Sequence, residues 1–208
     1  MFKSTWPLFI GLLAVICGCG SKTNNEVVVE KKTMLFTLLD NDETGISFNK
    51  DYRFNPRTYI KGAIAVGIDD LDNDGLMDLV FTSDIDEVNI GIYRNLGGFK
   101  FEDVTANSGI KTGRVMSINL VDINEDGLPD IYVTREGLQK NETGDGYTDH
   151  MRNQLFINQG NFTFEEKGKE YGLDLLGNTV CSNFFDYDND GDLDFFAVSH
   201  TNFEGNLM

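Results

Sequence analysis

The sequence is poor in basic residues. It has 17 Lys and Arg against 34 Asp and Glu, which gives a formal net charge of -17 at pH 7. Such a charge argues against electrostatic binding to nucleic acid or to anionic lipid. The acidic residues alternate with Gly, Asn and strand-forming residues instead of forming runs, and 40% of the residues are hydrophobic. This composition is sufficient for a packed core.

A hydrophobic run long enough to cross a membrane is also lacking at the N-terminus. The apolar stretch 7–16 follows Lys3 and is shorter than the roughly 20 residues that a membrane-spanning helix needs. It is therefore predicted to be a cleaved signal peptide over residues 1–18. Residues 16–19 (Ile-Cys-Gly-Cys) resemble a bacterial lipobox, and the small residue before Cys19 favours this cysteine for lipidation over Cys17. A plain signal peptide with incidental cysteines is the alternative.

Cysteine is too scarce to cross-link the fold with disulfides. Cleavage before Cys19 leaves Cys181 as the one unmodified thiol, so no internal disulfide is expected even in the oxidising compartment that the predicted export implies. We predict Cys181 to be a core thiol. The polar residues 19–33 are predicted to form a lipid-anchored flexible tether, and residues 34–208 the folded body, in which bound metal supplies stability.

What the chain has in abundance is one acidic pattern, D-x-(D/N)-x-D-G-x-x-D. It occurs at residues 70–78 (loop 1), 122–130 (loop 2) and 186–194 (loop 3). Calcium takes six to eight oxygen ligands, and alternating acids at positions 1, 3 and 5 can supply them when the chain curls around an ion. Glycine at position 6 permits the sharp turn, the position 7 carbonyl adds a ligand and the Asp at position 9 completes the set. Acidic turns that bind no metal are the alternative.

The residues that flank these loops exclude an EF-hand. That motif requires Glu at position 12 and a helix on each side, whereas position 12 is Phe81, Val133 and Ala197. The flanks, such as residues 63–68 and 131–133, are rich in β-branched and aromatic residues and predict strands. Each loop is therefore expected to join two strands.

The repeat continues beyond the loops. Residues 93–101 match residues 156–164, with an Asn and Gly turn followed by alternating Phe residues that predict a hairpin. The predicted fold is all-β, built from units of four antiparallel strands with the acidic loop between the first two strands. The units span about 60–111, 113–175 and 177–208, and the third is incomplete.

Over residues 34–208 the chain resembles the FG-GAP/VCBS repeats of integrin α-subunits and large bacterial surface proteins. The resemblance implies a partial β-propeller whose blades hold about three calcium ions. Asn124 departs from the all-Asp form and drops one charge, so loop 2 is expected to bind more weakly. The implied metal ligands are Asp70, Asp72, Asp74, Leu76, Asp78, Asp122, Asn124, Asp126, Leu128, Asp130, Asp186, Asp188, Asp190, Asp192 and Asp194.

Catalytic motifs are missing as well. The two histidines, His150 and His200, belong to no H-E-x-x-H pattern, and neither G-x-S-x-G nor a P-loop occurs. We therefore expect no enzyme but a calcium-binding lipoprotein, exported to the bacterial outer membrane or cell surface and held at the membrane through its lipid anchor only. It would serve as a binding, adhesion or scaffold module for an unidentified protein or glycan, with the polar insertion 136–152 as either a contact or a solvated loop. The alternative is part of a secreted carbohydrate-active enzyme of the polysaccharide lyase kind.

The three units are too few for a closed ring. Residues 36–46 resemble residues 101–110, the closing stretch of a unit, and so predict an orphan last strand. The chain is therefore expected to be the front end of a longer propeller. We expect two complete blades, one half blade and exposed strand edges.

Overall fold

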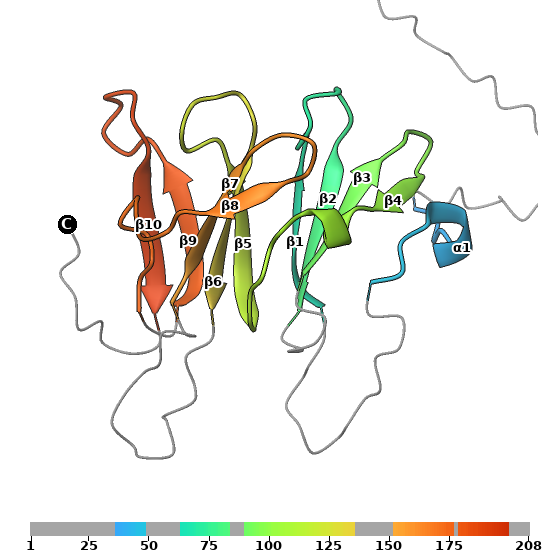
Figure 1. Cartoon of the computed structure of the whole chain (residues 1–208), viewed down its shortest axis with the longest axis horizontal. Coiled ribbons are helices and arrows are strands. Elements are labelled where there is room, and N and C mark those ends of the chain that lie inside the picture. The colour runs from blue at the N-terminus through green and yellow to red at the C-terminus, as the bar shows by residue number, and fades with distance from the viewer. Residues whose placement is uncertain (1–35, 49–62, 84–89, 136–151, 177–178, 200–208) are drawn as a thin grey trace, which may run out of the picture. The chain divides into compact units, whose positions relative to one another are not determined.

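The computed structural model describes residues 36–48, 63–83, 90–135, 152–176 and 179–199 (Figure 1). The chain divides into two compact units, Met1–Thr37 and Leu38–Met208, and all the sheets belong to the second. The predicted signal peptide, lipidation site and tether lie outside the described residues, as do both histidines and residues 136–151 of the insertion. No helix in the described ranges has the length and apolar character to span a membrane.

The described body is built from antiparallel sheets, as the sequence predicted. Blade 1 and blade 2 each have four strands in sequential order, and blade 3 is a two-stranded hairpin. The strands of blade 1 are β1 (Ala63–Asp69), β2 (Asp78–Ser83), β3 (Ile90–Asn95) and β4 (Phe101–Asp103). Those of blade 2 are β5 (Val115–Val121), β6 (Asp130–Arg135), β7 (Gln154–Asn158) and β8 (Phe164–Glu166). Blade 3 contains β9 (Thr179–Phe185) and β10 (Asp194–Ser199).

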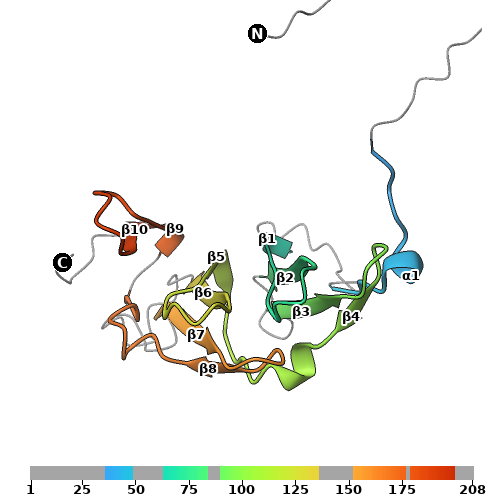
Figure 2. The same cartoon turned by 90° about the horizontal axis from the view of Figure 1, so that it is seen from above.

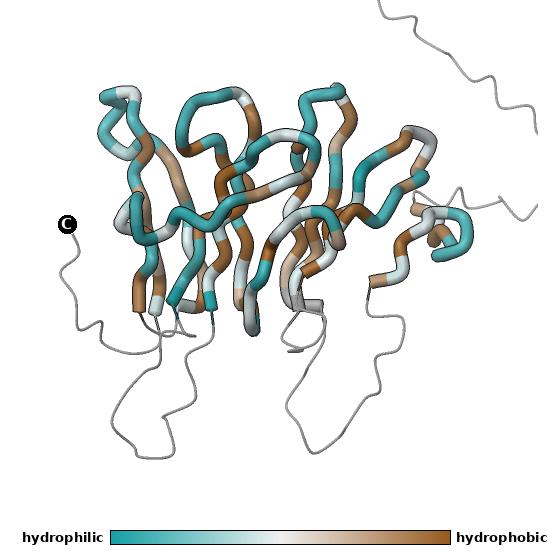
Figure 3. The backbone as a smooth tube through the Cα atoms, in the orientation of Figure 1, coloured by the Kyte–Doolittle hydropathy of each residue, from teal (hydrophilic) through white to brown (hydrophobic). Residues whose placement is uncertain are grey.

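The acidic loops connect the first two strands of each blade in one common register. The last Asp of each loop pairs with the residue before its first Asp: Asp78 with Asp69, Asp130 with Val121, and Asp194 with Phe185. All three loops lie at the same end of the sheets (Figure 1), where the chain is hydrophilic, while hydrophobic residues follow the strands (Figure 3). The prediction of strands on both sides of each loop is confirmed.

The blades pack face to face. Blade 2 packs against blade 1 with one face and against blade 3 with the other. Alternate residues of its strands point to opposite faces and so enter different clusters. Ile131 and Phe156 belong to the core shared with blade 1, whereas Tyr132 contributes to a second cluster with Phe184 and Phe195 of blade 3. The Tyr132 ring meets both phenylalanines edge to face, at centroid distances of 5.4 and 5.3 Å.

The first strands of neighbouring blades lie side by side, β1 next to β5 and β5 next to β9 (Figure 2). Gly67 of β1 permits this approach. A Cβ atom at Gly67 would lie 2.9 Å from the Leu120 side chain of β5, so only glycine leaves room for that leucine.

The two outer faces of this stack are apolar and exposed. Phe196 of β10 occupies the register position that Tyr132 fills in β6, yet Phe196 is 60% exposed and Tyr132 is fully buried. On blade 1, Val66 and Ile68 are also exposed.

Cys181 lies on the outer face of blade 3, the face that carries Phe196, and is exposed. The prediction of a core thiol is therefore wrong: within the described residues no further sheet covers this face.

The N-terminal segment follows the predicted repeat only in part. Helix α1 (Asn41–Thr44) ends at Gly45, whose φ is +78°, and Gly45 lies against the Phe101 carbonyl of β4. Gly109, with φ +74°, lies in the same way against the Phe164 carbonyl of β8, after the 3-10 helix η1 (Thr105–Asn107). Residues 36–40 form no strand. The expected orphan strand is absent from these residues, and no strand of the described residues pairs with them.

Candidate metal centre

Each acidic loop has the same backbone conformation. Positions 4 and 6 both adopt the left-handed region, which Gly and Asn enter most readily. Sequence reasoning foresaw the glycine turn but missed the second left-handed residue, although Asn at this position in two loops is a recognisable signal. The φ values are +59°, +59° and +62° at Asn73, Glu125 and Asn189, and +88°, +89° and +97° at Gly75, Gly127 and Gly191.

The first Asp of each loop closes the turn by accepting the glycine N–H. The distances are 2.7 Å from Gly75 to Asp70 Oδ2, 2.8 Å from Gly127 to Asp122 and 3.2 Å from Gly191 to Asp186. The Asp at position 5 in turn accepts the N–H of position 7, at 2.9 Å for Leu76, 2.9 Å for Leu128 and 3.1 Å for Asp192. Backbone N–H groups thus orient two carboxylates in every loop.

The last Asp anchors its loop to the sheet. Asp78 accepts the Leu71 N–H at 2.9 Å with one oxygen and the Asn95 N–H of β3 at 2.7 Å with the other. Asp130 is held in the same way, at 3.0 Å from the Ile123 N–H and 2.7 Å from the Asn158 N–H. Burial raises the pKa of Asp78 to about 6, with a smaller contribution from the neighbouring carboxylates, because a low-dielectric environment disfavours the charged form. Burial raises the pKa of Asp130 for the same reason.

In loops 1 and 3 three carboxylates converge. One oxygen from each of Asp70, Asp72 and Asp78 lies within 4.8 Å of the others, and the same holds for Asp186, Asp188 and Asp194. Clustered carboxylate oxygens are the donor set that hard divalent cations such as Ca²⁺ prefer. Oδ1 of Asp72 is moreover buried and accepts no hydrogen bond. The two triads therefore fit a cation.

Loop 2 is arranged differently. Asn124 takes the place of the second Asp, and its amide donates to Asp126 Oδ2 at 2.9 Å. An amide oxygen remains at this position, but no three carboxylates of loop 2 converge as they do in loops 1 and 3. The difference follows from the neutral Asn at the position where loops 1 and 3 have Asp.

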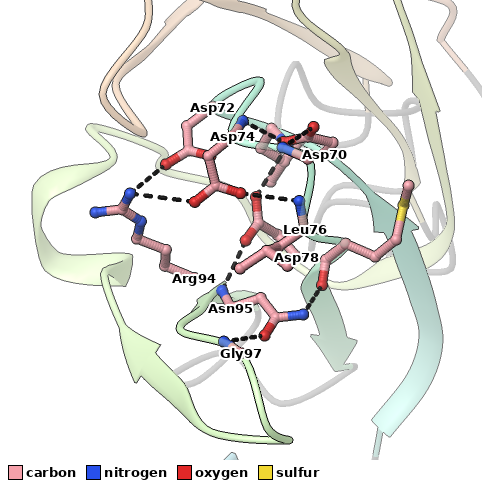
Figure 4. Close-up of polar contacts among 11 residues, drawn as sticks. Asp70, Asp72, Asp74, Leu76, Asp78, Arg94, Asn95 and Gly97 are labelled. Atoms are coloured by element: carbon pink, nitrogen blue, oxygen red, sulfur yellow. Dashed lines mark hydrogen bonds and ion pairs between the residues drawn. The ribbon is translucent and has the colours of Figure 1, made fainter.

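Loop 1 faces an arginine that the sequence did not connect with it (Figure 4). Nη2 of Arg94, on β3, lies 2.9 Å from Asp72 Oδ2 and 3.3 Å from Asp74 Oδ2. The Arg94 guanidinium also lies 5.9 Å from the ring centroid of Phe162, which belongs to the β7–β8 turn of blade 2. No local pattern could have identified Arg94, because its partners come from another strand and another blade.

The Asn residues of the two hairpins, Asn95 and Asn158, form hydrogen bonds to the backbone of the acidic loops. Asn95 donates to the Met77 carbonyl at 2.7 Å and accepts the Gly97 N–H at 2.8 Å. Asn158 donates to the carbonyls of Pro129 in its own blade, at 3.0 Å, and of Leu71 in loop 1, at 2.9 Å. Sequence reasoning treated both Asn residues only as turn formers. Their matching positions in the two copies were the signal for this second role.

The geometry defines a repeat protein in which acidic loops join the first two strands of antiparallel blades. Comparison with known proteins agrees: residues 70–133 match the family of FG-GAP-like repeats, a range that begins at the first Asp of loop 1 and ends in β6. The chain therefore contains an FG-GAP-like repeat. No curated protein matches the chain.

Proposed function

We propose that this protein is a calcium-binding, exported lipoprotein whose blades present a binding, adhesion or scaffold surface. The observation that carries the proposal is the triple occurrence of one loop geometry, with converging carboxylates in loops 1 and 3. A bound calcium ion would neutralise the negative charge of these carboxylates. The side chains at positions 1, 3, 5 and 9 of each loop, with the position 7 carbonyl, would hold the ion.

Calcium binding would stabilise the fold. Asp70, Asp72 and Asp78 repel one another where their oxygens converge, and a cation between them removes this repulsion. Cys181 is a free thiol, so it contributes no disulfide to the described body. A ligand that binds only the native state adds about 2.7 kcal/mol per site at a hundredfold excess over its dissociation constant.

A thermal melt in buffered calcium and in chelator tests this proposal. We expect calcium to raise the melting temperature strongly and magnesium to do so weakly, because magnesium requires stricter octahedral geometry. Asp188→Ala should reduce the calcium-dependent increase more than Asn124→Ala, since it removes a charged member of a converging triad. An identical melting temperature in calcium and in chelator would contradict the proposal.

The proposed surface role rests on the sequence features of residues 1–33 together with the repeat architecture. The exposed apolar faces around Phe196 and Val66 suit packing of further blades of the same kind, which supports a longer propeller. Immobilised glycans and extracellular-matrix proteins, screened with and without calcium, would identify the partner. Calcium-dependent capture of one class is expected, and capture that calcium does not affect would argue against a role of the loops in binding.

A further inference from the structure

Arg94 distinguishes loop 1 from loop 2. In β3, Arg94 follows Tyr93, which pairs with Leu79, the residue after the last Asp of loop 1. In β7, Phe156 pairs with Ile131, the residue after the last Asp of loop 2, so the position equivalent to Arg94 is Ile157. Blade 2 therefore has an apolar residue where blade 1 has a cation. In loop 2 the oxygen that corresponds to the Arg94 partner Asp74 Oδ2 accepts instead from the neutral amide of Asn124.

Arg94 engages only one oxygen of each carboxylate (Figure 4). It pairs with Oδ2 of Asp72 and Oδ2 of Asp74, while Oδ1 of Asp74 accepts the Leu76 N–H. Oδ1 of Asp72 remains buried and without a hydrogen bond. The guanidinium thus supplies positive charge to two candidate ligands and leaves one ligand oxygen of Asp72 available.

The neighbouring blade helps to hold Arg94 in this position. The Arg94 side chain is 39% exposed, and ion pairs of that exposure are individually weak. Here one guanidinium meets two carboxylates on one side and the buried Phe162 ring on another. The cation–π contact restricts its motion and links loop 1 to blade 2.

We propose that Arg94 is a built-in counter-cation that offsets the repulsion among the loop 1 carboxylates without calcium and lowers the calcium affinity of loop 1. The inference rests on the proposed function. Arg94 reduces the net charge of the four loop 1 aspartates, so a divalent ion is attracted to the loop less strongly. Two cations that share the same carboxylates also repel each other. In water this repulsion corresponds to a change in dissociation constant on the order of tenfold.

Site-resolved calcium titrations by NMR can test the proposal. The N–H groups of Gly75, Gly127 and Gly191 each donate to the first Asp of one loop, so each reports on that loop separately. In calcium-buffered solutions of low ionic strength, Arg94→Gln should lower the half-saturating calcium concentration at Gly75 by about tenfold and leave the other two glycines unchanged. The difference should shrink as salt is added.

Two matched variants and a second measurement complete the test. Arg94→Lys keeps the positive charge, so its calcium titration should match that of the wild type. Arg152→Gln removes one positive charge, as Arg94→Gln does, but beside Asp174 and away from the loops. It should leave the titrations of all three glycines unchanged. In chelator, Arg94→Gln should lower the melting temperature more than it does in saturating calcium. If the half-saturating calcium concentration at Gly75 is unchanged or raised in Arg94→Gln, the inference is overturned. If no glycine responds to calcium, the proposed function itself fails.

Discussion

Replacement of Asn158 by Ala tests the hydrogen bonds that join blade 1 to blade 2. Asn158 is 1% exposed, and its side chain makes three hydrogen bonds, to the carbonyls of Leu71 and Pro129 and from the N–H of Gly160. A typical hydrogen bond contributes about 1 kcal/mol, and a buried polar group left without a partner costs about 1–3 kcal/mol. Since the Leu71 carbonyl lies in the other blade, we expect Asn158→Ala to lower the free energy of unfolding by about 4 kcal/mol.

Asn95→Ala is the matched control, because Asn95 has the equivalent place in blade 1. It makes two side-chain hydrogen bonds, both within its own blade, and is partly exposed. Its loss should cost about 2 kcal/mol. Both substitutions retain the backbone N–H that donates to the last Asp of the loop.

Urea unfolding in saturating calcium, followed by far-ultraviolet circular dichroism, measures the difference. Trp6 lies in the predicted signal peptide, so tryptophan fluorescence would not report on the blades. With a urea slope of about 2 kcal/mol per molar, the midpoint should fall by about 2 M for Asn158→Ala and about 1 M for Asn95→Ala. If Asn158→Ala is no more destabilising than Asn95→Ala, the bond between the blades does not contribute as argued.

Two further substitutions test other parts of the chain. Gly45→Ala places a Cβ atom against the backbone oxygen of Phe101 in β4 at a φ of +78°, and should lower the free energy of unfolding by about 2 kcal/mol or more. Gly97 has a similar φ of +81° but open space around it, so Gly97→Ala should lower the free energy of unfolding by only about 1 kcal/mol. Equal losses for the two variants in urea titrations would show that the steric clash at Gly45 does not destabilise the fold. Cys19→Ser should release the protein from bacterial membranes and Cys17→Ser should not, as measured by fractionation and immunoblotting. Equal retention of both variants would contradict lipidation at Cys19.

The sequence predicted features that depend on short-range spacing. The alternation of acids before Gly75, Gly127 and Gly191 located the loops, and the β-branched and aromatic flanks predicted strands in place of helices. The Asn and Gly turns located both hairpins. These predictions succeeded because turn conformation and strand alternation are determined mainly by neighbouring residues.

Long-range contacts could not be predicted in this way. Cys181 was expected in the core because it lies in an apolar strand, but the burial of a strand face depends on whether another sheet covers it. Residues 36–40 resemble a strand in sequence and form none, since a strand requires a partner for its backbone groups. The interactions of Arg94 with Phe162 and of Asn158 with Leu71 likewise cross between blades.

The sequence by itself therefore determined the repeating unit, the position of each acidic loop and the carboxylates that each loop carries. The tertiary structure decided how these units act on one another. It buried both faces of blade 2, brought Arg94 to loop 1 and joined Asn158 to the Leu71 carbonyl. The reason is physical: donor spacing is a property of a few consecutive residues, whereas burial and charge compensation depend on which segments, distant in the chain, pack together.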